Sequence, residues 1–550
     1  MGSAELPMSV AATGLYYLDH FRFALRWLHD RYADLMSVPE SDFVHQFGAL
    51  PRESQALLVR LIMRRGQRFR ASKVKYPEIG NTARACGPLI ELQWVDPRPL
   101  LSIEDLARLI TRAELAELFP ALPSSLSKAQ ALAVLREMHR DKRSFEDWRC
   151  SVSEPVYLVS IASLCTRLRL LFFGNFRQEW SEFVLADLGV FRYEAVPLCR
   201  ESRAFHTRQD IEDFYLLYEC RRMLYEEAPL ADVLALLPRA SLQHEWLEAR
   251  RSKLEFRVAR RYEIAGERQQ ALKLYEECSH PDARWRAIRM LEIDARYREA
   301  HAIVCAELQV PESHAQEQRL ARVLHRLERR LGLPPSPRKR PARPERMDLI
   351  VPTPKAGESV EFIALKLVAA PEAPVYYVEN TLINSLFGLL CWEALFAPVS
   401  GAFFHAFHSA PMDLFSRTFR HRRAVLFDRC LDMLQSDLYK DAIKENFLAK
   451  RGIQSLFVAW SVLDEDLLDT ALACIPAAHL RQYFERLLSD LPENRTGLPD
   501  LVQFWVHEKR YRMIEVKGPG DRLQDNQQRW MNFCVEQNLP VAVCHVHWAA

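Results

Sequence analysis

The hydrophobic pattern divides the chain into a long helical part and a shorter part with both strands and helices. Apolar residues recur at helical spacing from about residue 10 to residue 90, as in 16–32. Residues 101–138 predict a short helix pair followed by a third helix, which Ser125 or Ser127 would cap. Residues 150–245 are again helical, and residues 246–332 have an almost continuous amphipathic helical pattern. We therefore predict an α-rich architecture as far as residue 332.

An internal echo lies within residues 246–332. Glu263-Ile264 is followed by Ala271, and Glu292-Ile293 is followed by Ala300 at equal spacing. This is typical of a degenerate helical-repeat pair of the TPR type, with a period shorter than the usual TPR length. Such repeats form a rigid curved layer, and we expect this one to present a surface to which a protein partner can bind.

The composition changes after the repeats. Residues 333–346 are rich in proline and arginine and cannot form a helix, so we expect residues 333–356 to connect two domains. From 357 to 550 we predict one α/β domain. Residues 501–506 and 511–516 predict paired strands, and residues 540–547 predict a last strand. Before the last strand we expect a helix that Asp521 caps, with Leu523, Trp530, Met531 and Phe533 on its apolar side.

Three charged residues interrupt the predicted strands. Asp500 opens the first strand, and Glu515 and Lys517 lie two positions apart on the second, so both project from the same face. Two carboxylates and one ammonium on a half-buried sheet are costly to desolvate, and a divalent cation would offset that cost. Carboxylate oxygens suit Mg²⁺ or Mn²⁺. The alternative is a structural Glu515–Lys517 ion pair with Asp500 capping a turn, which an isolated E-x-K pattern favours.

The composition limits the classes of function. A chain of 550 residues suggests three or four domains, and a net charge of only +2 means that a nucleic-acid role needs local basic patches. Residues 64–76 form one such patch, in which cations are interleaved with aromatic residues. The patch either contacts phosphate groups or is a solvated basic loop. Its cations are Arg64, Arg65, Arg68, Arg70, Lys73 and Lys75.

The cysteines and histidines do not indicate a second metal centre. The 12 cysteines include no C-x-x-C pair, which favours a reducing compartment without a disulfide framework or structural zinc. We interpret His405 and His408 as core or polar-network residues. The N-terminus lacks a signal pattern and residues 389–404 are too short for a membrane span. We therefore expect a cytoplasmic protein, associated with the nucleoid if it is bacterial.

The pattern P-D-x14-E-x-K at residues 499–517, followed by a Gln-rich helix, resembles the PD-(D/E)xK nuclease core. The motifs G-L-P-D-L and E-V-K-G-P-G-D-R-L resemble, more specifically, the VRR-NUC branch of this class. Further stretches resemble the Fanconi-anaemia-associated nuclease family, and the winged-helix-like, SAP-like and repeat-like segments occur in the right order. These stretches are 378–379, 388–396, 410–415, 497–502, 514–523 and 543–546. Nothing matches the ubiquitin-binding zinc finger of eukaryotic members, so we expect a bacterial member.

The pattern and the resemblance together give a multidomain plan. We expect DNA-binding helical regions in the N-terminal part, helical repeats in the middle and the nuclease domain at the C-terminal end. The segments are a winged-helix-like region (1–95), a SAP-like module (96–150), a helical region (151–245), TPR-like repeats (246–332), a linker (333–356) and an α/β PD-(D/E)xK domain of the VRR-NUC type (357–550).

The resemblance also implies the composition of the site. It assigns metal binding to Glu379, Asp500, Glu515 and the carbonyl of Val516, and it makes Lys517 the catalytic lysine. Two ions, Mg²⁺ or Mn²⁺, would stabilise the attacking and leaving oxygens of a phosphodiester. By its position alone, Glu379 predicts an acid at a helix N-terminus. Two further residues are expected to contact DNA or lie near the site, namely Arg420 and Gln527.

The implied substrate is branched DNA. The resemblance implies a 5′-flap endonuclease with 5′–3′ exonuclease activity that could unhook interstrand crosslinks. The residues alone indicate only a metal-dependent phosphodiesterase. Two alternatives stay open at this point, a sequence-specific restriction-type endonuclease and a non-catalytic DNA-junction scaffold.

Overall fold

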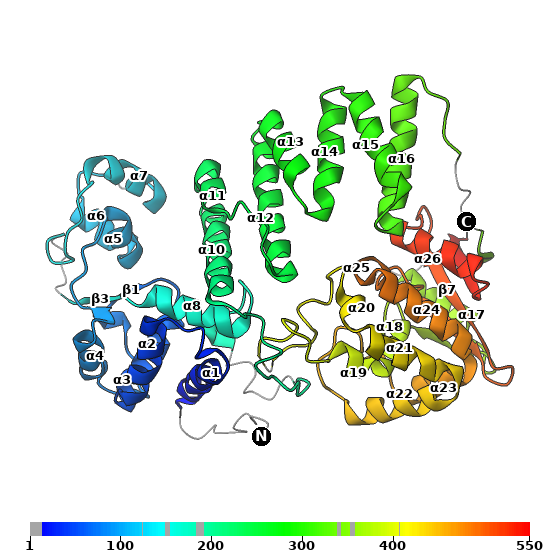
Figure 1. Ribbon diagram of the computed structural model, residues 1–550, viewed down its shortest axis with the longest axis horizontal. Coiled ribbons are helices and arrows are strands. Elements are labelled where there is room, and N and C mark those ends of the chain that lie inside the picture. The colour runs from blue at the N-terminus through cyan, green and yellow to red at the C-terminus, as the bar shows by residue number, and fades with distance from the viewer. Residues whose placement is uncertain are drawn as a thin grey trace. The chain divides into compact units, whose positions relative to one another are not determined.

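The protein forms two compact units in a computed structural model that describes residues 14–123, 125–148, 154–182, 192–337, 343–352, 358–405 and 407–549. The first unit comprises Met1–Phe191 and Pro197–Tyr215, and the second comprises Arg192–Val196 and Leu216–Ala550. The boundary between Tyr215 of the first unit and Leu216 of the second lies within α10 (Arg208–Tyr225). Figure 1 labels the elements of both units.

The first unit begins with three helices and a small sheet. The three strands are antiparallel in the order β1-β3-β2, so the sheet joins residues that lie far apart in the sequence. The predicted basic patch forms β1 and a 3₁₀ turn at Ala71–Lys73. The elements are α1 (Tyr16–Tyr32), α2 (Val38–Ala49), α3 (Arg52–Ile62), β1 (Arg68–Arg70), α4 (Thr82–Glu91), β2 (Val95–Asp96), β3 (Val156–Val159) and α8 (Ala162–Phe173).

A small helical module lies between β2 and β3 in the sequence. Its helices α5 (Ile103–Leu109), α6 (Arg112–Leu118) and α7 (Lys128–Met138) each begin with a capping box. Ser127 is the N-cap of α7, which decides between the two predicted caps. A shared apolar core that includes Leu106, Leu115 and Leu135 holds the three helices together.

The repeat region is a series of antiparallel helices. The pattern that predicted almost continuous helix over 246–332 is in fact interrupted by four tight turns. Two of the turns contain Gly266 (φ +84) and Ala295 (φ +58), which occupy equivalent positions of the predicted echo. Ala271 and Ala300, also equivalent, are fully buried in one core. The helices are α11 (Leu230–Leu236), α12 (Glu245–Ile264), α13 (Arg268–Glu277), α14 (Pro281–Ile293), α15 (Tyr297–Gln309) and α16 (His314–Leu331).

The last part of the second unit contains a five-stranded mixed sheet in the order β4-β8-β7-β6-β5. Strands β5, β6 and β7 are antiparallel neighbours, whereas β8 runs parallel to both β7 and β4. The three predicted strands are confirmed, and none of their ends is shifted by more than one residue. The strands are β4 (Glu345–Val351), β5 (Val375–Tyr377), β6 (Leu501–Trp505), β7 (Arg510–Lys517) and β8 (Val541–Trp548).

Two local predictions were wrong. The segment 333–356 is not a connector throughout, because β4 pairs along its whole length with β8. Asp521 does not cap the helix α26 (Asp525–Glu536). Gln524 is the N-cap and forms a capping box with Gln527, while Asp521 Oδ2 accepts a hydrogen bond from the Gly518 amide at 3.2 Å.

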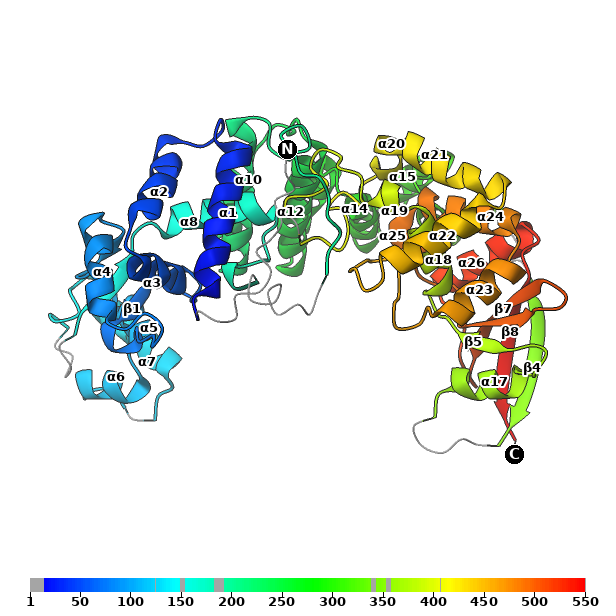
Figure 2. The same ribbon diagram turned by 90° about the horizontal axis from the view of Figure 1, so that it is seen from below.

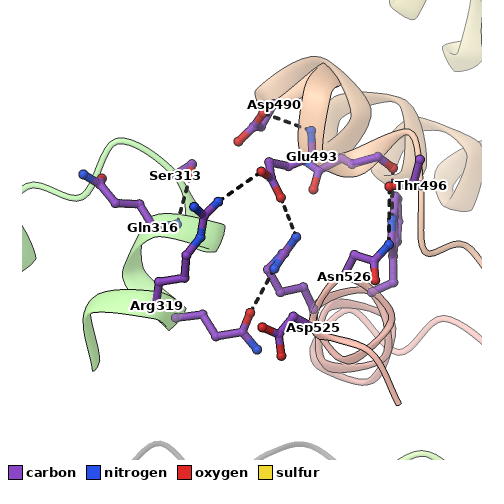
Figure 3. A network of polar contacts seen from close by, with 12 residues as sticks. Ser313, Gln316, Arg319, Asp490, Glu493, Thr496, Asp525 and Asn526 are labelled. Atoms are coloured by element: carbon purple, nitrogen blue, oxygen red, sulfur yellow. Dashed lines mark hydrogen bonds and ion pairs between the residues drawn. The ribbon is translucent and has the colours of Figure 1, made fainter. Parts of the chain in front are cut away.

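Helices cover the sheet and anchor it to the repeats. Helix α17 packs across β5, β7 and β8 (Figure 2). On another side, α16 of the repeats contacts α26 through a polar network (Figure 3), in which Glu493 accepts hydrogen bonds from Arg319 at 3.3 Å and Arg529 at 2.7 Å. The helices are α17 (Val360–Val368), α18 (Leu382–Leu390), α19 (Trp392–Leu395), α20 (Phe419–Arg422), α21 (Ala424–Asp432), α22 (Leu438–Ala449), α23 (Glu465–Cys474), α24 (Ala477–Ser489) and α25 (Leu491–Asn494).

The structure also describes most of the cysteines, the two predicted core histidines and the helices that could have spanned a membrane. Eleven described cysteines are all free thiols. His405 and His408 are buried with stacked rings whose centroids lie 4.1 Å apart, and their ring nitrogens accept hydrogen bonds from the Phe407 and Phe404 amides. Burial lowers the pKa of both histidines. In the described part of the chain, every helix is too short or too polar to cross a membrane.

The equivalent turns of the repeats allow a paired test of backbone strain. Gly266 and Ala295 are both exposed, and a Cβ on Gly266 would meet no atom within 4 Å, so only the backbone conformation distinguishes the substitutions. We expect Gly266→Ala to destabilise the repeats by about 1 to 2 kcal/mol, and Ala295→Gly to stabilise them by about 0.5 to 1 kcal/mol. Scanning calorimetry of the full chain measures both. Changes of the same sign would contradict equivalent left-handed turns.

Candidate functional site

The sheet brings Asp500, Glu515 and Lys517 together. Asp500 directly precedes β6, and Leu501 pairs with Ile514, so Asp500 lies beside Glu515 on the adjacent strand β7. The Asp500 carboxylate accepts a hydrogen bond from the Val516 amide at 2.8 Å, and its backbone carbonyl accepts one from the Val378 amide at 2.8 Å. Both strands and the end of β5 therefore fix the position of Asp500.

The three charged groups are almost completely withdrawn from water. Glu515 is 0%, Asp500 6% and Lys517 9% exposed. The Lys517 ammonium lies 2.6 Å from Glu515 Oε1, so the predicted ion pair is present. However, Glu515 Oε2 has no hydrogen-bond partner among the described residues. The ion pair alone leaves one carboxylate oxygen buried without a partner, which is costly.

The electrostatic state of the two acids reflects this burial. Burial, and after it the charge of the neighbouring Asp500, raise the pKa of Glu515 to about 8, although Lys517 acts in the opposite direction. Burial also raises the pKa of Asp500 to about 6, against the hydrogen bond from Val516 and the charge of Lys517. An added cation would stabilise both ionised forms, as expected of a site built to bind one.

Glu379 lies at the end of β5 and is exposed. It is not a helix N-terminal acid, because α18 begins at Leu382. The Tyr377 hydroxyl donates a hydrogen bond to Glu379 Oε2 at 2.5 Å. The next residue, Asn380, has φ +52 and accepts a hydrogen bond from the Leu498 amide at 3.0 Å. This turn therefore ties Glu379 to the loop that leads into Asp500.

The carboxylates fit a divalent cation in part. Asp500 and Glu515 supply hard oxygen ligands, and Glu515 Oε2 is buried without a partner among the described residues. The charge of Glu379 raises the pKa of both acids, so it acts on the same site. Nevertheless, among the residues described, no three His, Cys, Asp or Glu side chains form a group that could hold a metal ion. Tyr377 holds the Glu379 carboxylate in a separate hydrogen bond.

The predicted DNA-contacting cations of residues 64–76 differ in their exposure and in their partners. Arg70 is buried and donates to Glu114 and Glu154, both at 2.5 Å, and Arg68 forms an ion pair with Asp105 at 3.1 Å. These two guanidinium groups therefore have structural partners. The exposed cations of the patch are Arg64, Arg65, Lys73 and Lys75.

Two other predicted contacts lie elsewhere in the second unit. Gln527 uses its side-chain oxygen to accept a hydrogen bond from the Gln524 amide at 2.9 Å, so it caps its own helix. Arg420 is exposed and lines a cavity of about 620 Å³ between the repeats and the nuclease helices. The sequence did not indicate a role for Tyr377, although it lies only two positions before Glu379.

This mixed sheet, with a buried Asp, Glu and Lys on adjacent strands, defines a nuclease domain of the PD-(D/E)xK class. The family described as "VRR-NUC domain" matches residues 434–548, "FAN1, HTH domain" matches 15–96 and "Fanconi anemia-associated nuclease SAP domain" matches 100–148. The chain belongs to the Fanconi-associated nuclease family, whose members are DNA nucleases that depend on divalent metal ions.

Several relatives support this membership. A Fanconi-associated nuclease 1 homolog of Pseudomonas aeruginosa is 49% identical over 99% of this chain and 98% of its own length. A homolog of Arabidopsis thaliana is 22% identical over 94% of this chain and 65% of its own length. A crystal structure of paFAN1 bound to 2-nt 5′-flap DNA with a gap superposes with a TM-score of 0.90 at 49% identity, covering 98% of this chain and 100% of that one.

The raised pKa of Glu515 predicts a pH dependence of stability without metal. Glu515 stays protonated in the folded protein to about pH 8, whereas in the unfolded chain it ionises from about pH 4. Its contribution to the free energy of unfolding is therefore complete below about pH 4, falls by about 1.4 kcal/mol per pH unit above that, and is lost near pH 8. We expect Glu515→Gln to become progressively more stable than the wild type between pH 5 and pH 8. Thermal unfolding in a metal chelator measures this difference, and parallel pH profiles of the two proteins would contradict it.

Proposed function

We propose that the chain is a structure-specific DNA nuclease that cuts 5′-flapped and other branched DNA with two divalent ions, Mg²⁺ or Mn²⁺. The observation that carries the proposal is the buried Asp500–Glu515 pair, in which Glu515 Oε2 has no hydrogen-bond partner among the described residues. The likeness to a structure bound to 5′-flap DNA supports flapped DNA as the substrate. It also favours recognition of DNA shape over the recognition of base sequence by a restriction-type enzyme.

The residues have separate roles in this proposal. Asp500 would bridge the two ions, Glu515 and the Val516 carbonyl would hold the first, and Glu379 would turn toward the second. Bound ions would stabilise the attacking and leaving oxygens of an in-line displacement. Lys517, already 2.6 Å from Glu515, would orient the attacking water or balance negative charge on the phosphate. A scaffold without catalysis would not explain why these charges are buried together.

The exposed cations of the first unit would hold the duplex. Arg64 and Arg65 precede β1 and Lys73 and Lys75 follow it, and contacts of such residues with phosphate groups need no recognition of bases. Arg420, on α20 of the nuclease domain, would be a further DNA contact. We also propose that the surface of the helical repeats binds a protein partner, and that 5′–3′ nicking by this enzyme serves the repair of interstrand crosslinks.

The nuclease site is tested by a charge-neutral substitution of the bridging acid. We expect Asp500→Asn to lower the cleavage rate of a labelled 5′-flap duplex in Mn²⁺ by at least about 100-fold, because a metal ligand is removed. Asp437→Asn is the matched control, since Asp437 is exposed on the surface beside α22. Unchanged cutting by Asp500→Asn would place the active site elsewhere, and binding without cutting by the wild type would return the scaffold alternative.

The proposed contacts between the basic patch and DNA phosphate groups are tested by the salt dependence of DNA binding. We expect the double variant Lys73→Gln, Lys75→Gln to bind flap DNA more weakly and to reduce the slope of log K against log salt by about 2, since each phosphate contact contributes about 0.9. The control is Lys440→Gln with Lys444→Gln, because both lysines are already paired with Asp437 and Asp469. Fluorescence anisotropy between 50 and about 200 mM salt measures the slope. An unchanged slope would make the patch a solvated loop.

A further inference from the structure

The face of the nuclease sheet that carries Glu515 and Lys517 continues onto the neighbouring strand β8. Lys517 pairs in register with His545, and Glu515 pairs with Val543. Residues in register on adjacent strands project from the same face, and such strands lie about 4.8 Å apart. His545 belongs to residues 543–546, one of the stretches that resemble the nuclease family, but it has no role in the proposed mechanism. Its position makes it the neighbour of Lys517 on the active face.

Helix α17 covers the opposite face of the sheet. Val516 of β7 and Cys544 of β8 lie in one apolar core with Ala364 of α17. Side chains alternate between the two faces along a strand, so Lys517 and His545 project away from this core. The histidine is therefore on the side of the sheet where the acids and the lysine of the site lie.

On this side, the sheet changes from buried to exposed at His545. Lys517 of β7 is buried, and His545 beside it is partly exposed. Asp348, the partner of His545 on β4, is exposed, and so is His547 two positions further along β8. His545 thus lies at the border between the withdrawn site and a face that a large substrate can reach from solvent.

His545 also differs from its polar neighbours in its hydrogen bonding. Asp348 accepts a hydrogen bond from Arg346 at 2.8 Å and lies 2.8 Å from Nε2 of His547. The ring nitrogens of His545 have no hydrogen-bond partner in the described part of the chain, and they are open to solvent. Burial lowers the pKa of His545, so its ring is neutral at neutral pH and carries one N–H donor. This donor is available to a group from outside the protein.

We propose that His545 donates a hydrogen bond to a phosphate oxygen of the cleaved DNA strand, next to the scissile bond. This inference rests on the proposed nuclease function, in which Lys517 acts at the scissile phosphate. His545 lies one strand further along the same face, where the DNA backbone would continue. Hydrogen bonds to phosphate oxygens fix the position of a strand without reading its sequence. A neutral donor does this without placing a second positive charge beside the Lys517 ammonium.

A phosphate group suits this position better than a metal ion does. Mg²⁺ and Mn²⁺ favour carboxylate, carbonyl and water oxygens over imidazole nitrogen. Where the structure describes the chain, His545 also forms no metal-binding group with two other His, Cys, Asp or Glu side chains. His545 is therefore assigned to the substrate, and a metal-binding role is an outcome that the experiment can distinguish.

The experiment compares kcat/KM for cleavage of a labelled 5′-flap duplex in Mn²⁺ by the wild type, His545→Phe and His545→Gln. Phenylalanine keeps a ring and suits a strand but has no donor, whereas glutamine keeps a donor. The matched control is His507→Phe, because His507 is exposed in the turn between β6 and β7, at the other end of β7 from Lys517. We expect His545→Phe to lower kcat/KM by about 10-fold, His545→Gln to recover part of it, and His507→Phe to change nothing.

Substrates with one uncharged methylphosphonate linkage locate the contact. We expect the wild type to lose about 10-fold in kcat/KM at one linkage next to the scissile bond. His545→Phe should lose little more at that linkage, because the donor is already absent. Each protein is compared with itself, so a loss of stability cannot produce this result. Should His545→Phe not fold, His545→Val is a second variant without a donor that suits a strand.

Three outcomes would overturn the inference. Equal losses by wild type and His545→Phe at every modified linkage would remove the phosphate contact while leaving the nuclease function intact. Weaker binding of Mn²⁺ by His545→Phe than by the wild type, measured by isothermal calorimetry without DNA, would assign His545 to the metal site instead. A wild type that cuts no flap DNA would overturn the proposed function together with this inference.

Discussion

Two carboxylates kept out of water between adjacent strands determine how the rest of the nuclease domain is built. Glu515 is fully buried and Asp500 nearly so, and Lys517 cancels only one of their charges. Holding such groups together costs free energy unless a cation joins them. The surroundings supply the rigidity that this requires, since backbone amides of β5 and β7 fix Asp500 from opposite sides. The repulsion between the two acids raises the free energy of the metal-free domain, and a bound cation would remove this cost.

Short-range patterns were sufficient to predict the strands and the acids on them. The two runs at 501–506 and 511–516 alternate around one tight connection, so their pairing and the shared face of Glu515 and Lys517 follow from local periodicity. The same holds for the helical-repeat echo, whose two left-handed turns fall at equivalent positions. In each case the neighbours that decide the structure lie close in the sequence.

At Arg70 and at β4, by contrast, partners that are distant in the sequence decide the structure, and local patterns do not reveal them. Arg70 resembled a DNA contact, but its carboxylate partners lie 44 and 84 residues further along the chain. Strand β4 follows a Pro- and Arg-rich run and is mostly exposed, so only its distant partner β8 makes it a strand. The prediction that Asp521 caps a helix failed for a local reason, because Gln524 is the N-cap of α26 and forms a capping box with Gln527. The fit of Glu379 to the site likewise depends on Tyr377 and on a turn locked by Leu498.

The order of the sheet has a consequence for how the enzyme is made. Strand β4 precedes the other strands of the sheet in the chain, but within the sheet it pairs only with β8, which is synthesised after all the other strands. During translation β4 therefore waits without its neighbour, while β5, β6 and β7 can already pair. The catalytic sheet is completed only when the last strand inserts between β4 and β7. A chain that ends before β8 would therefore lack the strand that joins β4 to β7, and the open strand edges would favour aggregation.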